Sequence, residues 1–501
     1  MKRRIHELIE GSPSERIAVI DDDGRSYSYA DLDRISDGIA QKLRGHGVRG
    51  GDRVILLAEN GMTYAAAILA ISKVDAWVVP VNARVTEHDI KNALTHSGAR
   101  CIFYTVDDSS AALAHSEIFG GVDLGQEDCG RIVVSPVVEV EPEPVEAGAD
   151  QVAALFYTSG TTGTPKGVML THANLIFAAE ATSGVRGMEE DDIVLGVLPG
   201  THVYGFGGIL FPVWDAGATI RLMPRFEPKR VLEVLSDNIT LFPAVPQMYA
   251  ALLKEMNETG VDRVETPLRI VSSGGAPLDP NWKDEIERRF GIHMHNGYGM
   301  TEASPTISVT RLDDLRTDTS VGLALPGLEI KLRNESDDGA GELCVRGPNI
   351  MKGYYKDPDA TAKAMTADGF LKTGDVGRID PDGAIHIVGR CKELIVHSGF
   401  NVYPAEVESA LNAHSAVVQS AVVGRARDGN EDVIAFVTLA APVTEPELRA
   451  WMRSHLVSYK VPLHIIPVES LPQAATGKIL KGSLTSVFDD KLRQLDLEKN
   501  A

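Results

Sequence analysis

The sequence contains few cysteines, no long apolar run and no excess of positive charge. Its four cysteines are far apart and form neither a CxxC pair nor a zinc-ligand spacing, so we expect reduced thiols. No apolar run reaches the ~18 residues of a membrane-spanning helix, and no apolar stretch follows the basic N-terminus as it would in a signal peptide. The net charge of −21 argues against nucleic acid or an anionic membrane as the main partner. We therefore expect a soluble, cytoplasmic protein without integral membrane association.

The chain of 501 residues is too long for one hydrophobic core, and its first third alternates between helix and strand patterns. Ser28 is placed to cap a helix whose apolar residues recur on one face, namely Leu32, Ile35, Ile39 and Leu43. Strand, helix and strand patterns follow at 54–57, 64–72 and 77–79. This alternation predicts a layered α/β domain in which helices pack on a largely parallel sheet.

Three apolar strands predicted further along the chain each run into a polar or glycine-rich loop. They cover 155–157, 194–198 and 270–273. Ligands of open α/β sheets bind at the ends of adjacent strands. We therefore expect these three loops to converge on a ligand site.

The part of the chain after Glu329 changes to shorter alternating strands, and the section after Lys392 is smaller. This last section is predicted to contain helices at 404–412 and 445–455 and strands near 417–423 and 433–439. Residues 137–149 are rich in Glu, Pro and Val and predict a surface connection. We predict one domain over residues 1–391 and a second over 392–501.

The most informative segment is the loop Tyr157-Thr158-Ser159-Gly160-Thr161-Thr162-Gly163-Thr164-Pro165-Lys166-Gly167. Its hydroxyls and flexible amides can donate hydrogen bonds to phosphate oxygens, and Lys166 adds a positive charge. Pro165 stands where a Walker A loop requires glycine, so this is a different phosphate loop. The alternative is a flexible Ser/Thr/Gly linker, which the lysine and the preceding strand disfavour.

Four further blocks follow this loop in order along the chain. They are Asn296-Gly297-Tyr298-Gly299-Met300-Thr301-Glu302, Lys372-Thr373-Gly374-Asp375, Gly389-Arg390-Cys391-Lys392-Glu393 and the segment from Pro472 to Lys478. Together with the loop they resemble the signatures of the adenylate-forming superfamily, which includes acyl-CoA synthetases, 4-coumarate-CoA ligases, firefly-type luciferases and the adenylation domains of peptide synthetases. The resemblance covers essentially the whole chain. It implies an α/β fold with a large N-terminal domain of layered α/β sheets plus a small β-barrel-like portion, and a small, mobile α+β C-terminal domain.

The activity implied by the resemblance is that of an ATP-dependent acyl-CoA synthetase, an acid–thiol ligase that uses ATP, Mg²⁺ and coenzyme A. A carboxylic acid and ATP would form acyl-AMP and pyrophosphate, and acyl-AMP and CoA would then form acyl-CoA and AMP. No general base is needed, because a carboxylic acid with an ordinary pKa is already ionised at neutral pH. Two alternatives are a stand-alone adenylation enzyme that loads a carrier protein and a non-catalytic nucleotide-binding protein that kept the fold.

The resemblance also assigns roles to individual residues. Glu302 would hold the magnesium ion, Thr301 would donate to the α-phosphate, and Lys478 would be the catalytic lysine that stabilises the developing charge. Asp375 and Arg390 would bind the ribose or the phosphates. The remaining nucleotide-binding positions are Thr158, Ser159, Gly160, Thr161, Thr162, Gly163, Lys166, Gly275, Ala276, Asn296, Gly297, Tyr298 and Gly299.

The acid and CoA positions are implied in the same way. His202 would lie near the acid's carboxylate, although Thr201 stands where the family often has an aromatic residue. The tail would be surrounded by small or apolar residues, namely Tyr204, Gly208, Gly274, Met300 and Pro305. Because no cation is among them, we expect an uncharged aromatic or aliphatic tail; arylpropenoic, benzoic and medium-chain fatty acids all remain open. Lys392 would be the hinge between the domains, and Gly399 and Phe400 would lie beside the CoA thiol.

The segment Pro472-Gln473-Ala474-Ala475-Thr476-Gly477-Lys478 also resembles the segment at which many bacterial acyl-CoA synthetases are switched off by lysine acetylation. Acetylation would remove the positive charge that meets the α-phosphate. A lysine acetyltransferase and a deacetylase are then expected partners at Lys478. A homodimer is compatible with the sequence, which does not determine the oligomeric state.

Overall fold

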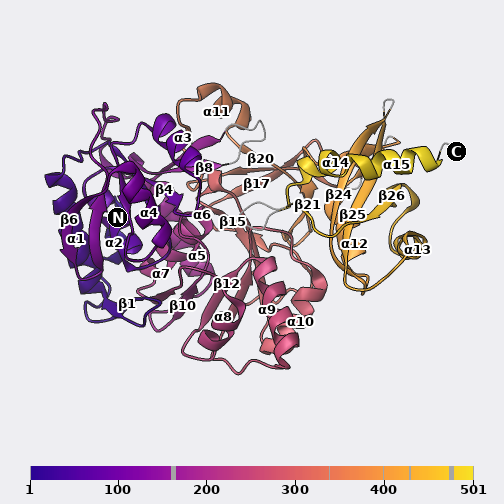
Figure 1. Cartoon of the computed structure of the whole chain (residues 1–501), viewed down its shortest axis with the longest axis horizontal. Helices are drawn as coiled ribbons and strands as arrows, with labels where there is room; N and C mark the ends of the chain where they lie inside the picture. Colours follow the sequence, from indigo (N-terminus) through magenta and orange to yellow (C-terminus); the bar gives the residue numbers. More distant parts are fainter. Residues whose placement is uncertain are drawn as a thin grey trace. The chain divides into compact units, whose positions relative to one another are not determined.

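A computed structural model describes residues 2–158, 165–337, 339–398, 400–427, 430–472 and 479–499. The chain divides into two compact units (Figure 1). Unit 1 consists of Met1–Leu278, Trp282–Ile330 and Val345–Lys372, and unit 2 of Asp279–Asn281, Lys331–Cys344 and Thr373–Ala501. The predicted alternation of helices and strands is confirmed, since the structure is a mixed α/β fold with large sheets in its N-terminal part. The boundary at 391/392 stays a prediction.

An eight-stranded sheet forms one layer of unit 1. Its inner strands β3, β4, β5 and β8 are parallel where they pair, as expected for a sheet covered by helices. The order is β19 (Gly353–Tyr354), β9 (Lys166–Thr171), β8 (Val152–Thr158), β4 (Trp77–Asn82), β3 (Arg53–Ala58), β5 (Cys101–Tyr104), β7 (Gly130–Val134) and β6 (Val122–Glu127).

A nine-stranded sheet forms a second layer. Strands β1, β11, β10, β12, β13 and β14 run parallel, and β2, β15 and β16 are antiparallel additions at its edges. The order is β16 (Leu323–Ala324), β15 (Thr306–Val309), β14 (Met294–Gly299), β13 (Ile270–Ser273), β12 (Leu241–Ala244), β10 (Ile193–Gly196), β11 (Thr219–Leu222), β1 (Ile17–Ile20) and β2 (Ser26–Ser28).

The three strands expected to carry converging loops therefore lie in two different sheets. Strand β8 belongs to the eight-stranded sheet, whereas β10 and β13 belong to the nine-stranded sheet and are separated there by β12. The three strands are therefore not all adjacent in one sheet, and the convergence of their loops on one ligand site stays a prediction. Apolar strands of similar composition carry no signal of which sheet they join, because pairing partners are chosen over long sequence separations.

Helices cover the sheets of unit 1, and the sequence pattern of the first of them is confirmed. The side chain of Ser28 accepts a hydrogen bond from the backbone N–H of Asp31 and forms a capping box at the start of α1 (Tyr29–Gly45). All four of its predicted apolar residues are fully buried. The other helices of eight or more residues are α2 (Met62–Lys73), α3 (Glu87–Ser97), α4 (Ser110–Phe119), α5 (His172–Val185), α8 (Pro228–Leu235), α9 (Pro246–Thr259) and α10 (Pro280–Phe290).

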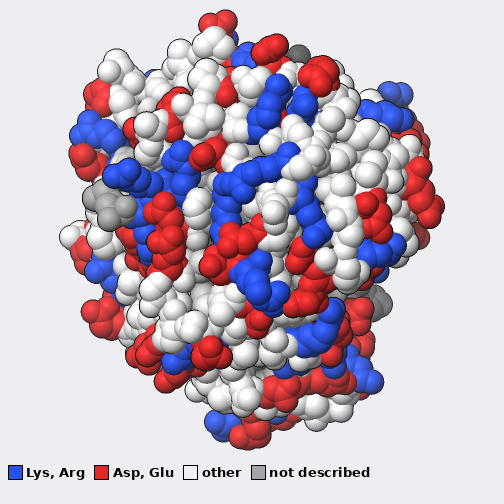
Figure 2. Space-filling model, turned by 90° about the vertical axis from the view of Figure 1, so that its left-hand side faces the viewer, with Lys and Arg blue, Asp and Glu red and all other residues white. Residues whose placement is uncertain are grey.

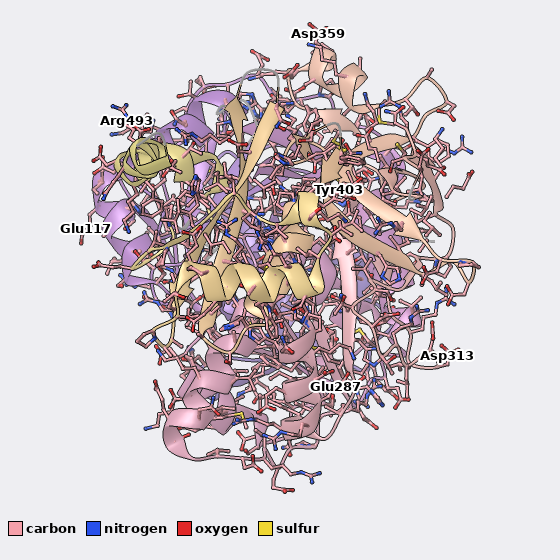
Figure 3. The ribbon with its side chains drawn as sticks, turned by 90° about the vertical axis from the view of Figure 1, so that its right-hand side faces the viewer. Glu117, Glu287, Asp313, Asp359, Tyr403 and Arg493 are labelled. Atoms are coloured by element: carbon pink, nitrogen blue, oxygen red, sulfur yellow. The ribbon has the colours of Figure 1, made fainter. Side chains whose placement is uncertain are left out.

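Unit 2 contains most of a four-stranded sheet, a small hairpin and a three-stranded sheet. Their orders are β17 (Glu329–Arg333), β18 (Gly341–Arg346), β20 (Leu371–Ile379) and β21 (Ile385–Arg390); β22 (Ile395–His397) and β23 (Phe400–Val402); and β24 (Val417–Arg427), β25 (Asn430–Leu439) and β26 (His464–Pro467). The predicted helices are confirmed as α12 (Pro404–Asn412) and α13 (Glu445–His455), and α14 (Leu484–Val487) and α15 (Asp489–Lys499) follow. Tyr403, labelled in Figure 3, is buried just before α12 and packs with Ala340 and Val376.

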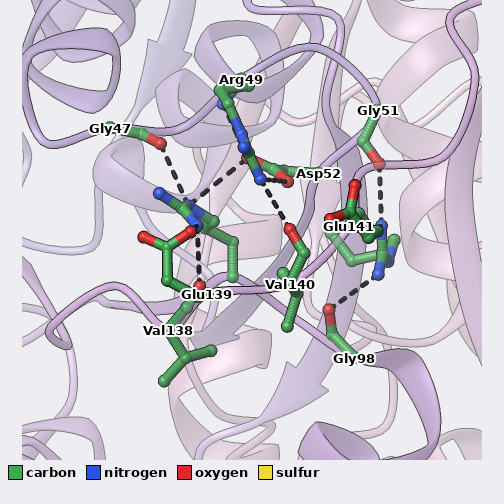
Figure 4. A network of polar contacts seen from close by, with 11 residues as sticks. Gly47, Arg49, Gly51, Asp52, Gly98, Val138, Glu139, Val140 and Glu141 are labelled. Carbon is green, nitrogen blue, oxygen red and sulfur yellow. Dashed lines mark hydrogen bonds and ion pairs between the residues drawn. The ribbon is translucent and has the colours of Figure 1, made fainter.

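The predicted surface connection at residues 137–149 crosses unit 1 without regular structure over most of its length. Three arginines donate to its backbone carbonyls: Arg100 to Val138 at 2.8 Å, Arg49 to Val140 at 2.7 Å and Arg53 to Glu141 at 3.1 Å (Figure 4). Since these carbonyls have no strand partner, the arginine side chains satisfy them instead.

Charged side chains of both signs lie on the surface. On the face of the molecule shown in Figure 2, lysines and arginines are interspersed with aspartates and glutamates. Within the described ranges, no helix is long and apolar enough to cross a membrane.

Candidate active site

The predicted phosphate loop joins two antiparallel strands. Thr158 ends β8 and Lys166 begins β9, and the two residues are directly opposite each other in the ladder. Opposed residues of an antiparallel pair present their side chains on the same face, so Thr158 and Lys166 are neighbours. The predicted residues Ser159, Gly160, Thr161, Thr162 and Gly163 lie outside the described residues.

A single tyrosine links Lys166 to Glu302. The Tyr354 hydroxyl donates a hydrogen bond of 2.8 Å to Glu302 Oε1, and Lys166 Nζ lies 4.7 Å from the centroid of the Tyr354 ring. Burial and the neighbouring Glu302 charge raise the pKa of Tyr354, so its hydroxyl stays a proton donor. We call these three residues the bridge cluster. It places the Glu302 carboxylate and the Lys166 ammonium group near the loop end of the β8–β9 hairpin.

The turn that carries Glu302 is fixed by the segment just before Tyr354. Thr301 and Glu302 form a short 3-10 turn, and the Glu302 carbonyl accepts from the backbone N–H of Met351 at 2.9 Å. The Asn349 side chain donates to the carbonyls of Ala303 at 3.0 Å and Thr306 at 2.9 Å. Sequence reasoning missed Tyr354, because an aromatic residue in a two-residue strand reads as ordinary core.

Glu302 can serve as the protein ligand of a magnesium ion whose other ligands are substrate phosphates and water. Oε1 accepts the Tyr354 bond, and a carboxylate has a second oxygen for a hard cation. Across the described residues there is no group of three or more His, Cys, Asp or Glu side chains that could hold a metal. One carboxylate is enough for Mg²⁺ when substrate phosphates and water complete its octahedral shell.

His202 lies at the start of α6 (Val203–Gly205). Its Nδ1 accepts a hydrogen bond of 3.2 Å from the backbone N–H of Tyr204, which places any ring proton of the neutral form on Nε2. Its side chain reaches solvent but is crowded by protein atoms, and this desolvation lowers the pKa of His202. The imidazole is therefore neutral at pH 7 and can donate through Nε2.

The residues predicted around the acid's tail come together around the Tyr204 ring. A Cβ on Gly208 would lie 3.0 Å from Tyr204 Cδ2 and 3.1 Å from Pro305 Cγ. A Cβ on Gly274 would lie 3.1 Å from Tyr204 Oη. All three distances are shorter than ordinary van der Waals contacts, so the two glycines make room for the ring. Met300 is tied to the same turn, since its N–H donates to the Pro305 carbonyl at 2.9 Å.

Asn60 supports the loop before His202, and sequence reasoning missed it. Its Nδ2 donates to the carbonyls of Gly196 at 3.2 Å, Leu198 at 2.9 Å and Met223 at 3.1 Å. Its Oδ1 accepts from the N–H of Gly200 at 2.7 Å. Asn60 follows a strand of the eight-stranded sheet, and its four partners belong to strand ends and loops of the nine-stranded sheet. No local signal in the sequence reveals this role.

The predicted nucleotide positions on the nine-stranded sheet are adjacent. Strands β13 and β14 pair in parallel, with Ser273 opposite Asn296, so Gly275 and Ala276 follow β13 beside the strand that carries Gly297, Tyr298 and Gly299. The Asn296 side chain itself binds protein: Nδ2 donates to the Thr319 carbonyl at 3.0 Å and Oδ1 accepts from Gly297 N at 3.0 Å.

In unit 2 the structure pairs Asp375 with Arg390. They are opposite each other in β20 and β21, and Arg390 Nε lies 3.2 Å from Asp375 Oδ1. Lys392 is exposed, and Phe400 is 54% exposed and stacks on Tyr459 with a centroid distance of 4.5 Å. Gly399 and Lys478 lie outside the described residues.

Comparisons with known proteins identify the family of the chain. Residues 6–355 match the family model "AMP-binding enzyme", and residues 406–478 match "AMP-binding enzyme C-terminal domain". The chain is 34% identical over 484 residues to a feruloyl-CoA synthase from Amycolatopsis sp., covering 93% of this chain and 94% of that protein. It is 34% identical over 498 residues to 4-coumarate–CoA ligase 5 from Oryza sativa subsp. japonica, covering 92% and 89%.

A solved structure shares the fold over nearly the full length. It is ATP-bound MatB from Rhodopseudomonas palustris, with a TM-score of 0.86, 28% identity, and coverage of 98% of this chain and 99% of that one. The sequence blocks, the fold and these matches together show that the chain belongs to the AMP-binding enzyme family.

Proposed function

We propose that this protein is an AMP-forming acyl-CoA synthetase that activates an arylpropenoic acid. Family membership carries the general activity, which converts a carboxylic acid, ATP and CoA to acyl-CoA, AMP and pyrophosphate. The bridge cluster is the structural observation that supports it most directly. It provides a lysine and a carboxylate, linked through Tyr354, beside the phosphate loop.

The chemistry requires charge neutralisation and positioning rather than proton transfer. A carboxylate oxygen of the acid attacks the α-phosphorus of ATP, and the bond to the bridging oxygen breaks as pyrophosphate leaves. Mg²⁺, when bound, would neutralise phosphate charge, with Glu302 as its protein ligand. Lys166 and Thr158 would bind phosphate oxygens, and Thr301 would donate to the α-phosphate. We assign the catalytic cation to Lys478 from the sequence.

In the second step the CoA thiolate attacks the acyl carbon, and AMP leaves with the electrons of the broken carbon–oxygen bond. We propose that Asp375 and Arg390 bind the ribose or the phosphates, Lys392 is the hinge, and Gly399 and Phe400 lie beside the thiol. The exposure of Phe400 supports a ligand-facing role, because a ring of this size is usually buried.

The acid is proposed from the pocket and the relatives together. Tyr204, Gly208, Gly274, Met300 and Pro305 form an environment for an uncharged aromatic body. Two relatives that align over most of the chain are named for feruloyl-CoA and 4-coumarate, both arylpropenoic. We favour this class over benzoic and medium-chain fatty acids.

The test is pyrophosphate release from the purified protein with ATP, Mg²⁺ and cinnamate, benzoate or octanoate, each with and without CoA. We expect acid-dependent pyrophosphate, fastest with cinnamate, and cinnamoyl-CoA detected by mass spectrometry. No acid-dependent release with any acid would favour the non-catalytic alternative. Adenylation without CoA transfer, with acyl transfer to a carrier protein, would favour the stand-alone adenylation enzyme.

Three further expectations rest on the sequence and belong to this proposal. We propose that the protein acts in the cytoplasm, because its cysteines show no disulfide or zinc pattern. We propose that acetylation of Lys478 by an acetyltransferase silences adenylation and that a deacetylase restores it, which mass spectrometry of native protein would test. A homodimer would be tested by light scattering of the purified protein.

A further inference from the structure

Arg186 brings a cation to the residues predicted around the acid's tail. It is the residue after α5, and its Nη1 donates to the Gly208 carbonyl at 3.4 Å. It also lies close enough to the Tyr204 phenol to oppose the rise in that group's pKa that burial causes, as does Ser272. Arg186 is thus beside two of the predicted tail residues, although it is 18 residues from the nearer of them in the sequence, Tyr204.

A small cavity next to Arg186 is lined by both polar and apolar side chains. Its lining includes Arg186, Ser272, Ser273, His295 and Thr310. Ser273 is 1% exposed, and its hydroxyl has no hydrogen-bond partner among the described residues. Burying an unpaired hydroxyl is unfavourable, so natural proteins rarely retain one without a ligand or a water to satisfy it.

Arg186 contributes the positive charge to the lining of this cavity. No ion pair among the described residues includes it, and the neighbouring His295 is kept neutral, because burial and then the Arg186 charge lower its pKa. An arginine after a helix also interacts favourably with the helix dipole, which explains its presence but not the position of its guanidinium beside Tyr204 and the cavity. A guanidinium has five N–H donors and no acceptor, and the Gly208 carbonyl accepts from only one of its nitrogens.

We propose that Arg186, Tyr204, Ser272 and Ser273, the tail-end cluster, bind a hydrogen-bond-accepting oxygen at the end of the acid's tail. This inference rests on the proposed function and specifies its substrate. The expectation of a wholly uncharged tail was made because no cation stands among the predicted tail residues, and Arg186 removes that premise. A hydrocarbon end offers the Arg186 guanidinium no acceptor, whereas a hydroxyl or a carboxylate would accept hydrogen bonds from it.

The experiment compares three acids that differ only at the far end of the ring: 4-methylcinnamate, 4-hydroxycinnamate and 4-carboxycinnamate. Each is measured by kcat/KM for pyrophosphate release and, independently of turnover, by calorimetric binding. The variants are Arg186→Met and the matched control Arg230→Met, which removes an exposed arginine from α8 of the same unit.

We expect the unaltered protein to prefer at least one of the oxygen-bearing acids to 4-methylcinnamate. Arg186→Met should lower kcat/KM and affinity for that acid by about tenfold to a hundredfold, the range for losing a hydrogen bond to a charged group, and leave 4-methylcinnamate within about twofold. A larger effect on 4-carboxycinnamate would identify an anionic tail, and a larger effect on 4-hydroxycinnamate a neutral one. Arg230→Met should change neither.

Two results would overturn the inference. One is a preference of the unaltered protein for 4-methylcinnamate over both oxygen-bearing acids. The other is an equal loss for all three acids in Arg186→Met, which would make Arg186 a purely structural residue. Both leave the proposed acyl-CoA synthetase activity intact, because that activity fails only if no acid supports pyrophosphate release or no acyl-CoA forms.

Discussion

Tyr354→Phe is the substitution that tests the bridge cluster most sharply. It removes the hydroxyl that donates a hydrogen bond of 2.8 Å to Glu302 Oε1. It keeps the ring, whose centroid lies 4.7 Å from Lys166 Nζ. A hydrogen bond to a charged group contributes about 1.5–3 kcal/mol, and 1.4 kcal/mol is a factor of ten. Glu302 is only 9% exposed, so water replaces the lost donor poorly. We therefore expect kcat/KM for MgATP to fall by about tenfold to a hundredfold.

The assay is pyrophosphate release at varied Mg²⁺, because a displaced Glu302 carboxylate should raise the Mg²⁺ concentration needed for half-maximal rate. Tyr355→Phe is a matched control, since the Tyr355 hydroxyl donates a hydrogen bond of 2.5 Å to Oε1 of Glu143 in the surface connection. It should lose a comparable bond and keep activity within about twofold. Equal losses in both variants, or an unchanged Mg²⁺ dependence in Tyr354→Phe, would refute the role of the bridge cluster.

Three other predictions concern the support of the site, the pH dependence of stability and the catalytic cation. Asn60→Leu should lower the free energy of unfolding by about 2–4 kcal/mol in urea titrations, because it leaves several buried backbone groups unpaired; an unchanged midpoint would contradict this. Burial raises the pKa of Asp108 to about 7 from an ordinary value of 3.8. The folded state then holds a proton that the unfolded state releases, so Asp108 lowers stability as pH rises from about 4 to about 7. Asp108→Asn should therefore stabilise the protein more at pH 8 than at pH 5, and equal effects would show that the carboxyl titrates normally. Lys478→Ala should slow adenylation by about a hundredfold and spare thioester formation from pre-made acyl-adenylate; normal adenylation would exclude Lys478 as the catalytic cation.

The sequence predicted secondary structure well where patterns are local. The Ser28 cap, the apolar face of α1 and the bounds of α12 and α13 depend on residues a few positions apart, and all are confirmed. The sequence did not show that β8 belongs to one sheet and that β10 and β13 belong to the other. Strand pairing is decided between residues far apart in the chain, and the composition of one strand does not encode its partner.

The residues of the candidate site likewise fall into those that the sequence predicts and those that only the structure reveals. Ordered motifs determined by themselves the family and the general reaction, and they predict site residues such as Lys166, Glu302 and Asp375, which stand in recognisable local contexts. Only the tertiary structure brought in Tyr354, Asn60 and Arg186, whose partners lie in distant segments. A hydroxyl, an amide and a guanidinium acquire their roles from the atoms that folding places within hydrogen-bond reach, and that distance is a property of the packed chain.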